Sequence, residues 1–197
     1  MVYRYFIIYK PFQVLSQFTA KSSNHKTLKH FFSVPGDVYP VGRLDADSEG
    51  LLILTNDPQL NQQLLDPGSG HEREYQVQVE GTISDEAIRS LEEGVLINID
   101  GKLYKTKKCG VEKFTTEPEV WPRTPAIRMR KNIPTSWIRI ILSEGKNRQV
   151  RKMTAKVGYP TLRLIRYRIQ GITIVGLLPG EMMEIKREVV YKKLFNT

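Results

Sequence analysis

One short segment combines an arginine with three carboxylates, Arg43, Asp45, Asp47 and Glu49. It leads directly into residues 51–55, which have the apolar character of a buried strand. Because an unpaired charge is costly to bury, these charges must satisfy one another or meet a ligand. Carboxylates placed in this way can bind a metal ion, cap a turn or react with a substrate. The segment is therefore the first candidate for a site.

Calcium binding is one alternative for this segment. Asp45, Asp47, Glu49 and Gly50 match the first half of a calcium loop, which needs oxygen ligands at positions 1, 3 and 5 and a glycine at position 6. Position 12, where a bidentate glutamate should complete the site, is Asn56. The flanking residues also indicate strand where that loop requires two helices, so the pattern disfavours calcium.

A capped turn is the second alternative, with Asp47 and Ser48 bonded to neighbouring backbone groups. For these two residues it is the better interpretation. Asp45 belongs to a wider pattern, because residues 42–45 (Gly-Arg-Leu-Asp) and 48–52 (Ser-Glu-Gly-Leu-Leu) resemble the nucleophile motif of pseudouridine synthases. The resemblance is to the RsuA/RluB/RluE-type branch, which modifies ribosomal RNA.

Further motifs of that family follow in the expected order, so the resemblance covers nearly the whole chain. Related synthases often open the catalytic domain with a strand ending in Asn-Lys-Pro, and this chain has Tyr-Lys-Pro at the corresponding place. The second motif has a tyrosine two residues after a basic one, and the third is rich in arginine and lysine. The matching segments are residues 9–11, 73–75, 144–153, 157–160 and 164–169.

The resemblance implies a mechanism for three catalytic residues. Pseudouridine formation breaks the bond between C1′ and N1 and joins C5 to C1′, so the uridine must first leave its stack. Asp45 would act at C1′, either by attacking that carbon or by removing a sugar proton. Arg151 would pair with Asp45 and keep it ionised. Tyr75 would stack on the uracil and help to remove the C5 proton, although a core tyrosine is an equally good interpretation of that residue alone.

Five further residues are expected to bind the substrate. By the resemblance, Leu164 packs on the base and Arg43 supports the backbone of the flipped nucleotide. The other three residues are cations that bind phosphates, although a solvated helix face is the alternative for Lys152. These residues are Leu164, Arg43, Arg148, Lys152 and Arg166. The family needs no cofactor and no metal. The sequence agrees, because its three histidines lack zinc spacing and no glycine-rich phosphate loop is present.

The charge of the chain favours a polyanionic partner. Thirty Lys and Arg against 21 Asp and Glu give a net charge of +9. Residues 128–168 contain twelve basic residues and one acidic residue, so this segment is the strongest indication of RNA binding. Cys109 is the single cysteine and rules out an internal disulfide. No apolar run approaches the ~20 residues of a membrane span, and residues 1–10 lack signal-peptide features, so we expect a cytoplasmic protein without membrane contact.

Strands and helices in mixed order must position these residues, which predicts an α+β fold with a mostly antiparallel central sheet flanked by helices. Strands are expected at residues 3–9, 51–55, 72–81 and 137–142, with Tyr75 on the inward face of the third. We also expect a hairpin in residues 96–107 and a last strand before residue 185. Helices are expected at residues 27–32, 58–65, 84–94, 148–158 and 191–195.

The catalytic motif begins within ten residues of Met1, so we expect no S4-type RNA-binding domain before it. We expect a single catalytic domain, residues 1–197, with two lobes facing one another across an RNA cleft, and a monomer. This favours the short RluE-like enzymes that act on large-subunit (23S) ribosomal RNA, free or in a pre-ribosomal particle. A small-subunit or transfer RNA target stays open. The alternative function is a catalytically silent RNA-binding or ribosome-assembly protein with the same fold.

Overall fold

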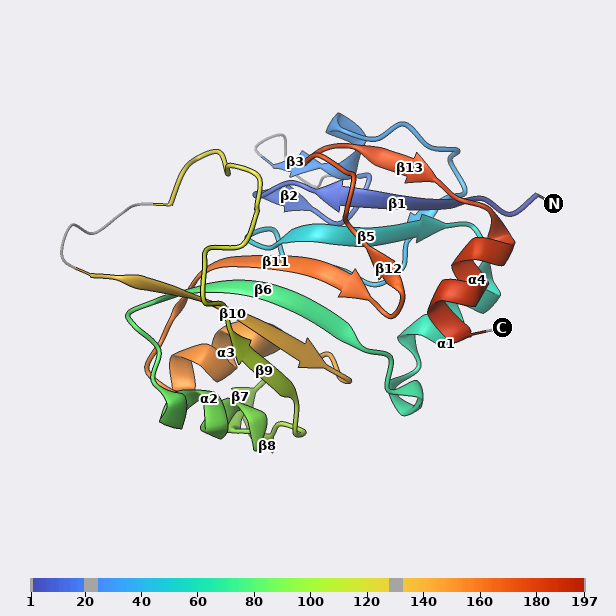
Figure 1. Ribbon diagram of the computed structural model, residues 1–197. Coiled ribbons are helices and arrows are strands. Elements are labelled where there is room, and N and C mark those ends of the chain that lie inside the picture. Colours follow the sequence, from blue (N-terminus) through green and yellow to red (C-terminus); the bar gives the residue numbers. More distant parts are fainter. Residues whose placement is uncertain (1, 20–24, 128–132, 197) are drawn as a thin grey trace. The chain divides into compact units, whose positions relative to one another are not determined.

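The computed structural model describes residues 2–19, 25–127 and 133–196 (Figure 1). Arg128, Arg130 and Lys131, at the start of the cationic segment 128–168, lie outside these ranges. The chain forms two compact units. Unit 1 combines Met1–His71 with Arg166–Thr197, and unit 2 is Glu72–Ile165. Strand β11 (Thr161–Ile169) contributes residues to both units.

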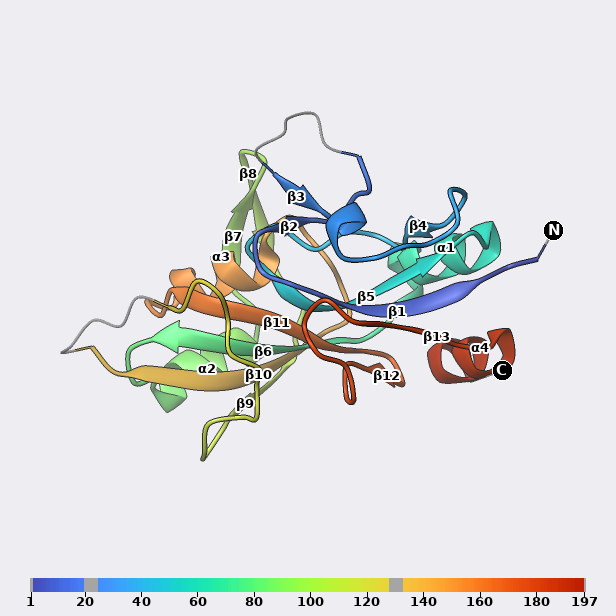
Figure 2. The same cartoon turned by 90° about the horizontal axis from the view of Figure 1, so that it is seen from above.

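Unit 1 is built on the antiparallel strands β13 (Met182–Glu184), β1 (Tyr5–Lys10) and β5 (Glu49–Thr55), in that order. Figures 1 and 2 show β1 and β13 side by side. Every residue of β1 and β5 is buried, because both strands are almost continuous apolar runs with both faces covered. Their register pairs Lys10 with Gly50, which places the lysine beside the end of the charged loop.

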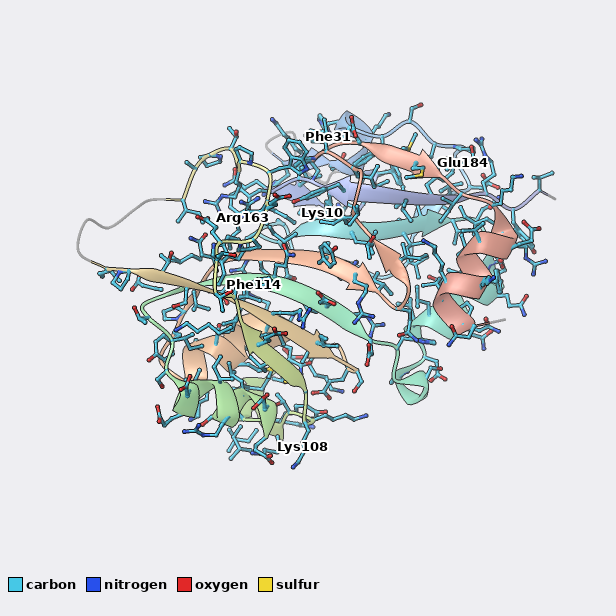
Figure 3. All side chains as sticks on the ribbon, in the orientation of Figure 1. Lys10, Phe31, Lys108, Phe114, Arg163 and Glu184 are labelled. Carbon is cyan, nitrogen blue, oxygen red and sulfur yellow. The ribbon has the colours of Figure 1, made fainter. Side chains whose placement is uncertain are left out.

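Short elements complete unit 1. They are β2 (Val14–Leu15), β3 (Lys26–Thr27), η1 (Leu28–His30), β4 (Tyr39–Pro40), α1 (Pro58–Leu65), η2 (Pro67–Ser69), β12 (Ile172–Thr173) and α4 (Arg187–Phe195). Figure 3 labels Glu184 of β13, whose carboxylate accepts two hydrogen bonds from the Arg4 guanidinium, at 2.7 and 2.6 Å. This pair attaches β13 to the start of β1.

Unit 2 contains the antiparallel strands β6 (Arg73–Glu80), β10 (Thr135–Leu142) and β9 (Gly110–Lys113). Two helices, α2 (Asp85–Glu92) and α3 (Gln149–Lys156), gather on one side of these strands, with the hairpin of β7 (Leu96–Ile99) and β8 (Lys102–Lys105) next to them (Figure 1). Their apolar side chains form one core that includes Val77, Leu91, Ile140 and Met153.

The Arg163 side chain, labelled in Figure 3, joins the proline-rich connection of unit 2 to β11. It is 5% exposed, and its Nη2 donates to the carbonyl oxygen of Trp121 at 2.7 Å. Residues 115–125 have no regular secondary structure, as their prolines predict, and this hydrogen bond ties the segment to β11.

The expected α+β fold is confirmed, and the helix at residues 58–65 has the predicted bounds. Other bounds were wrong. The expected helix at 27–32 is a single 3₁₀ turn, and β9 was not predicted because four mostly polar residues at a sheet edge give almost no pattern. The last helix begins at Arg187, earlier than predicted, because Val190 and Leu194, four residues apart, are both buried on one face.

Candidate active site

The loop that contains Asp45 is held by main-chain hydrogen bonds on both sides of that residue. The Ser16 hydroxyl donates to the carbonyl oxygen of Leu44 at 2.7 Å and accepts from the Leu44 amide at 3.0 Å. The Gln13 amide donates to the carbonyl oxygen of Ala46 at 2.7 Å. Asp45 itself is half-buried, and the main chain on both sides of it is held in place.

A buried lysine lies under this loop. The Lys10 side chain is 0% exposed, and its Nζ donates to the carbonyl oxygens of Val14 at 2.7 Å, Pro11 at 2.9 Å and Ala46 at 3.5 Å. Three main-chain carbonyl oxygens accept hydrogen bonds from this buried amine. Lys10, labelled in Figure 3, thereby joins the end of β1 to the Asp45 loop.

Burial lowers the pKa of Lys10 to about 7. The carboxylates of Glu49, Asp47 and Asp45 oppose this shift, whereas the positive charge of Arg166 adds to it. The predicted charge cluster therefore exists, but it also contains Lys10 and Arg166, which the sequence did not assign to it. A lysine directly continuing the apolar run 5–9 was the signal that could have revealed it.

Gly50 is required where β5 passes Arg166. Its φ is +105°, and a Cβ atom at this position would lie 2.3 Å from the carbonyl oxygen of Arg166. Arg166 is 5% exposed, and its Nε donates to the carbonyl oxygen of Leu51 at 2.8 Å. The glycine of the motif thus allows a close backbone approach that keeps the end of the loop in place.

Unit 2 holds the other expected site residues. Leu164 is 6% exposed and belongs to the apolar core of this unit, and Tyr75 is partly buried and packs against the same core. Arg151 of α3 is half-buried, with its Nη1 3.4 Å from the carbonyl oxygen of Thr161. Lys152 is half-buried on the same helix. These four side chains therefore come from β6, α3 and β11 of one unit.

Arg148 departs from the expected helix. It is the N-cap residue of α3 with φ +51°, so its exposed side chain precedes the helix instead of continuing a cationic helix face. The positions of the predicted residues thus divide by unit. Arg43 (exposed), Asp45 and Arg166 are in unit 1, and Tyr75, Arg148, Arg151, Lys152 and Leu164 are in unit 2.

The structure gives no support to calcium binding by the charged loop, and it tests the capped-turn alternative at Ser48. In the described part of the chain, no three His, Cys, Asp or Glu residues are placed to hold a metal ion. The capped-turn interpretation was wrong for Ser48, whose buried Oγ has no hydrogen-bond partner there. The turn is instead closed by the main chain, where the Ser48 amide donates to the carbonyl oxygen of Asp45 at 3.1 Å.

Comparison with known proteins decides the family. The sequence profile described as RNA pseudouridylate synthase matches residues 4–156. The chain belongs to the RNA pseudouridylate synthase family. The resemblance of the four motifs is thereby confirmed, and this pseudouridylate synthase is an enzyme with an RNA substrate.

Individual relatives agree with this assignment. The ribosomal large subunit pseudouridine synthase E of Xanthomonas campestris pv. campestris is 44% identical over 175 residues, 89% of this chain and 91% of the relative. The protein of the same name from Vibrio parahaemolyticus is 46% identical over 180 residues, 91% of this chain and 73% of the relative. A crystal structure of a pseudouridylate synthase, 23% identical, superposes with a TM-score of 0.79 over 98% of this chain and 74% of that chain. That structure shares the fold of this synthase.

Among the described residues of this pseudouridylate synthase, no helix is both long and apolar enough to cross a membrane.

Proposed function

We propose that this enzyme isomerises one specific uridine of large-subunit (23S) ribosomal RNA, with Asp45 as its catalytic carboxylate. The observation that carries the proposal is the half-buried Asp45, whose two chain neighbours are fixed by the Ser16 hydroxyl and the Gln13 amide. Relatives that are 44–46% identical carry the name ribosomal large subunit pseudouridine synthase E, which supports the choice of RNA.

The proposed reaction needs an ionised carboxylate at C1′ of a flipped uridine. If Asp45 attacks this carbon, the C1′–N1 bond breaks, the uracil turns, and the bond between Asp45 and C1′ breaks when C5 joins C1′. If Asp45 instead removes a sugar proton, the C1′–N1 bond breaks in the same way and Asp45 returns that proton after C5 has joined C1′. On either route C5 then loses its proton and N1 gains one. A carboxylate close to a guanidinium stays ionised, which is the role that we propose for Arg151. Tyr75 is proposed to stack on the uracil and to help remove the C5 proton.

The remaining expected residues have separate proposed roles. Leu164 packs on the base, Arg43 supports the backbone of the flipped nucleotide, and Arg148 and Lys152 bind phosphates. Arg166 is buried and bonded to Leu51, so we propose that it contributes to substrate binding by holding the start of β5. We further propose a monomeric, cytoplasmic enzyme whose residues 1–197 form one catalytic domain, acting on free RNA or on a pre-ribosomal particle.

Release of tritium from RNA that carries 5-tritiated uridine tests the proposal, because only isomerisation detaches that hydrogen. The native enzyme should release tritium. Asp45→Asn keeps the shape of the side chain but lacks the reactive carboxylate, so tritium release should vanish while RNA binding persists. Asp47→Asn is the matched control in the same loop and should retain most of the activity.

Two results would contradict the proposal. Turnover by purified Asp45→Asn, free of host synthase, would falsify the catalytic role of Asp45. RNA binding without any tritium release by the native enzyme would instead favour the silent RNA-binding or ribosome-assembly protein. Pseudouridine mapping in a strain that lacks the enzyme would then identify the modified nucleotide.

A further inference from the structure

Glu144 of unit 2 connects two segments that are far apart in sequence. Its carboxylate accepts hydrogen bonds from the Tyr104 hydroxyl at 2.5 Å, from the Lys107 amide at 3.0 Å and from Gln149 Nε2 at 2.6 Å. Gln149 is buried, and its Oε1 accepts from the Lys146 amide at 2.9 Å. This network fixes the end of the β7–β8 hairpin to the loop that precedes α3.

The network brings exposed cations together. Lys146 Nζ lies 5.0 Å from the centroid of the Tyr104 ring, in a cation–π contact. Lys102 is two residues before Tyr104 on β8, so both side chains point to the same face of the hairpin. Lys102, Lys107 and Lys146 are all exposed, and we call these three residues the hairpin–loop surface.

Carboxylates are scarce in this part of the sequence. Residues 101–108 and 145–156 contain nine lysines and arginines and no aspartate or glutamate. Glu144, between the two segments in space, directs its oxygens at three donors of unit 2. Two neighbouring lysines have protein partners, since Lys108 pairs with Glu93 and Lys105 Nζ donates to the carbonyl oxygen of Gly94, and we leave both outside the surface.

Like charges held close together repel one another unless a polyanion neutralises them. A network of half-buried hydrogen bonds that fixes cations side by side is therefore suited to a regular series of phosphates. We propose that the hairpin–loop surface binds the phosphate backbone of the RNA substrate outside the nucleotide that reacts. This inference rests on the proposed function only in taking RNA as the ligand, because it requires no turnover.

The test measures RNA affinity directly. Lys102→Ala/Lys107→Ala/Lys146→Ala is compared with Lys186→Ala/Lys192→Ala/Lys193→Ala, which removes the same charge from exposed positions at and in α4 of unit 1. The probe is a fluorescein-labelled, mixed-sequence, single-stranded RNA of about 20 nucleotides, titrated over a series of KCl concentrations. Each lost phosphate contact should flatten the plot of log Kd against log[KCl] by about 0.7. The first variant should therefore flatten the slope by about 2, and the α4 variant should keep the native slope.

Tyr104→Phe provides a second measurement that does not change the charge. It removes only the hydroxyl that bonds to Glu144, so a surface ordered by this network should lose RNA affinity by about 3-fold or more while the melting temperature stays within a few degrees. Equal slopes for the native protein and the hairpin–loop variant would overturn the proposal, as would equal flattening by both triple variants. Binding is measured without turnover, so the two proposals can fail separately. A native protein that releases no tritium would contradict the proposed function but not the binding of RNA by the hairpin–loop surface.

Discussion

Lys10 is a lysine in a strand whose other residues are apolar or aromatic, and it determines how the Asp45 loop is held. Within the described residues, the amine has main-chain carbonyls as its hydrogen-bond partners, and it lies within electrostatic reach of three carboxylates and one guanidinium. The charge of this residue near neutral pH therefore sets part of the stability of the loop.

This leads to a prediction about pH. The pKa of Lys10 is about 7 in the folded protein against an ordinary value of 10.5, so between these values the unfolded chain binds the extra proton. Raising the pH from 7 to 9.5 should then stabilise the native protein relative to Lys10→Met, by at most about 1.4 kcal/mol per pH unit. Below pH 7 the difference should be flat.

Urea unfolding at several pH values measures this difference. Lys29→Met is the matched control, because it makes the same substitution at an exposed position of unit 1. A native-minus-Lys10→Met difference that stays constant from pH 7 to 9.5 would show that the amine is not buried in the neutral form.

At the scale of elements, Asp57 attaches a helix to a strand. Its Oδ1 accepts from the Gln59 amide and, at 3.4 Å, the Leu60 amide at the start of α1, and its Oδ2 accepts from the hydroxyls of Tyr5 and Tyr191, both at 2.7 Å. Burial would raise the pKa of Asp57, but the two tyrosine hydroxyls and the backbone amides lower it overall. The stabilisation from this carboxylate is therefore present at neutral pH and is lost as the pH falls below about 4.

Asp57→Asn should destabilise the protein by about 1.5–3 kcal/mol, the range for a hydrogen bond to a charged group. Asp66→Asn is the control, since Asp66 caps the short turn η2 in the same way but is exposed, and its change should cost under about 1 kcal/mol. Guanidinium unfolding of both variants at pH 7 gives the comparison. Equal losses would mean that the two tyrosine hydroxyls contribute nothing measurable.

The elements show which features the sequence could predict. Strands β1 and β5 and helix α1 follow from long apolar runs and from Asp57 before Pro58, which are local signals. The three hydrogen bonds to Glu144, the partners of Lys10 and the Ser16 bonds to Leu44 were not predictable. Each joins residues whose proximity is set by tertiary packing, and no periodicity along the chain records it. Family motifs located Asp45, but only the structure shows how its loop is held.

For the whole molecule, the net charge of +9 predicts RNA binding that weakens steeply with salt. Lys152→Ala should flatten the plot of log Kd against log[KCl] by up to about 0.7, the value for one contact with a single strand. Lys29→Ala is the control, with the same change of charge at an exposed position of unit 1. A native affinity that does not depend on salt would contradict an electrostatic contribution by either unit.

The two units also differ in how their sequences are arranged, and this affects their synthesis on the ribosome. Unit 2 is one uninterrupted segment, Glu72–Ile165, whereas unit 1 needs residues from both ends of the chain. The nascent chain can therefore complete unit 2 first. Strands β1 and β5 cannot complete their packing until the segment that supplies β13 and Tyr191 has been synthesised. At about 5–20 residues per second, translating the 32 residues Arg166–Thr197 takes about 2–6 seconds. During this interval the apolar strands of unit 1 are exposed, so they are the part of the nascent enzyme that a chaperone should recognise.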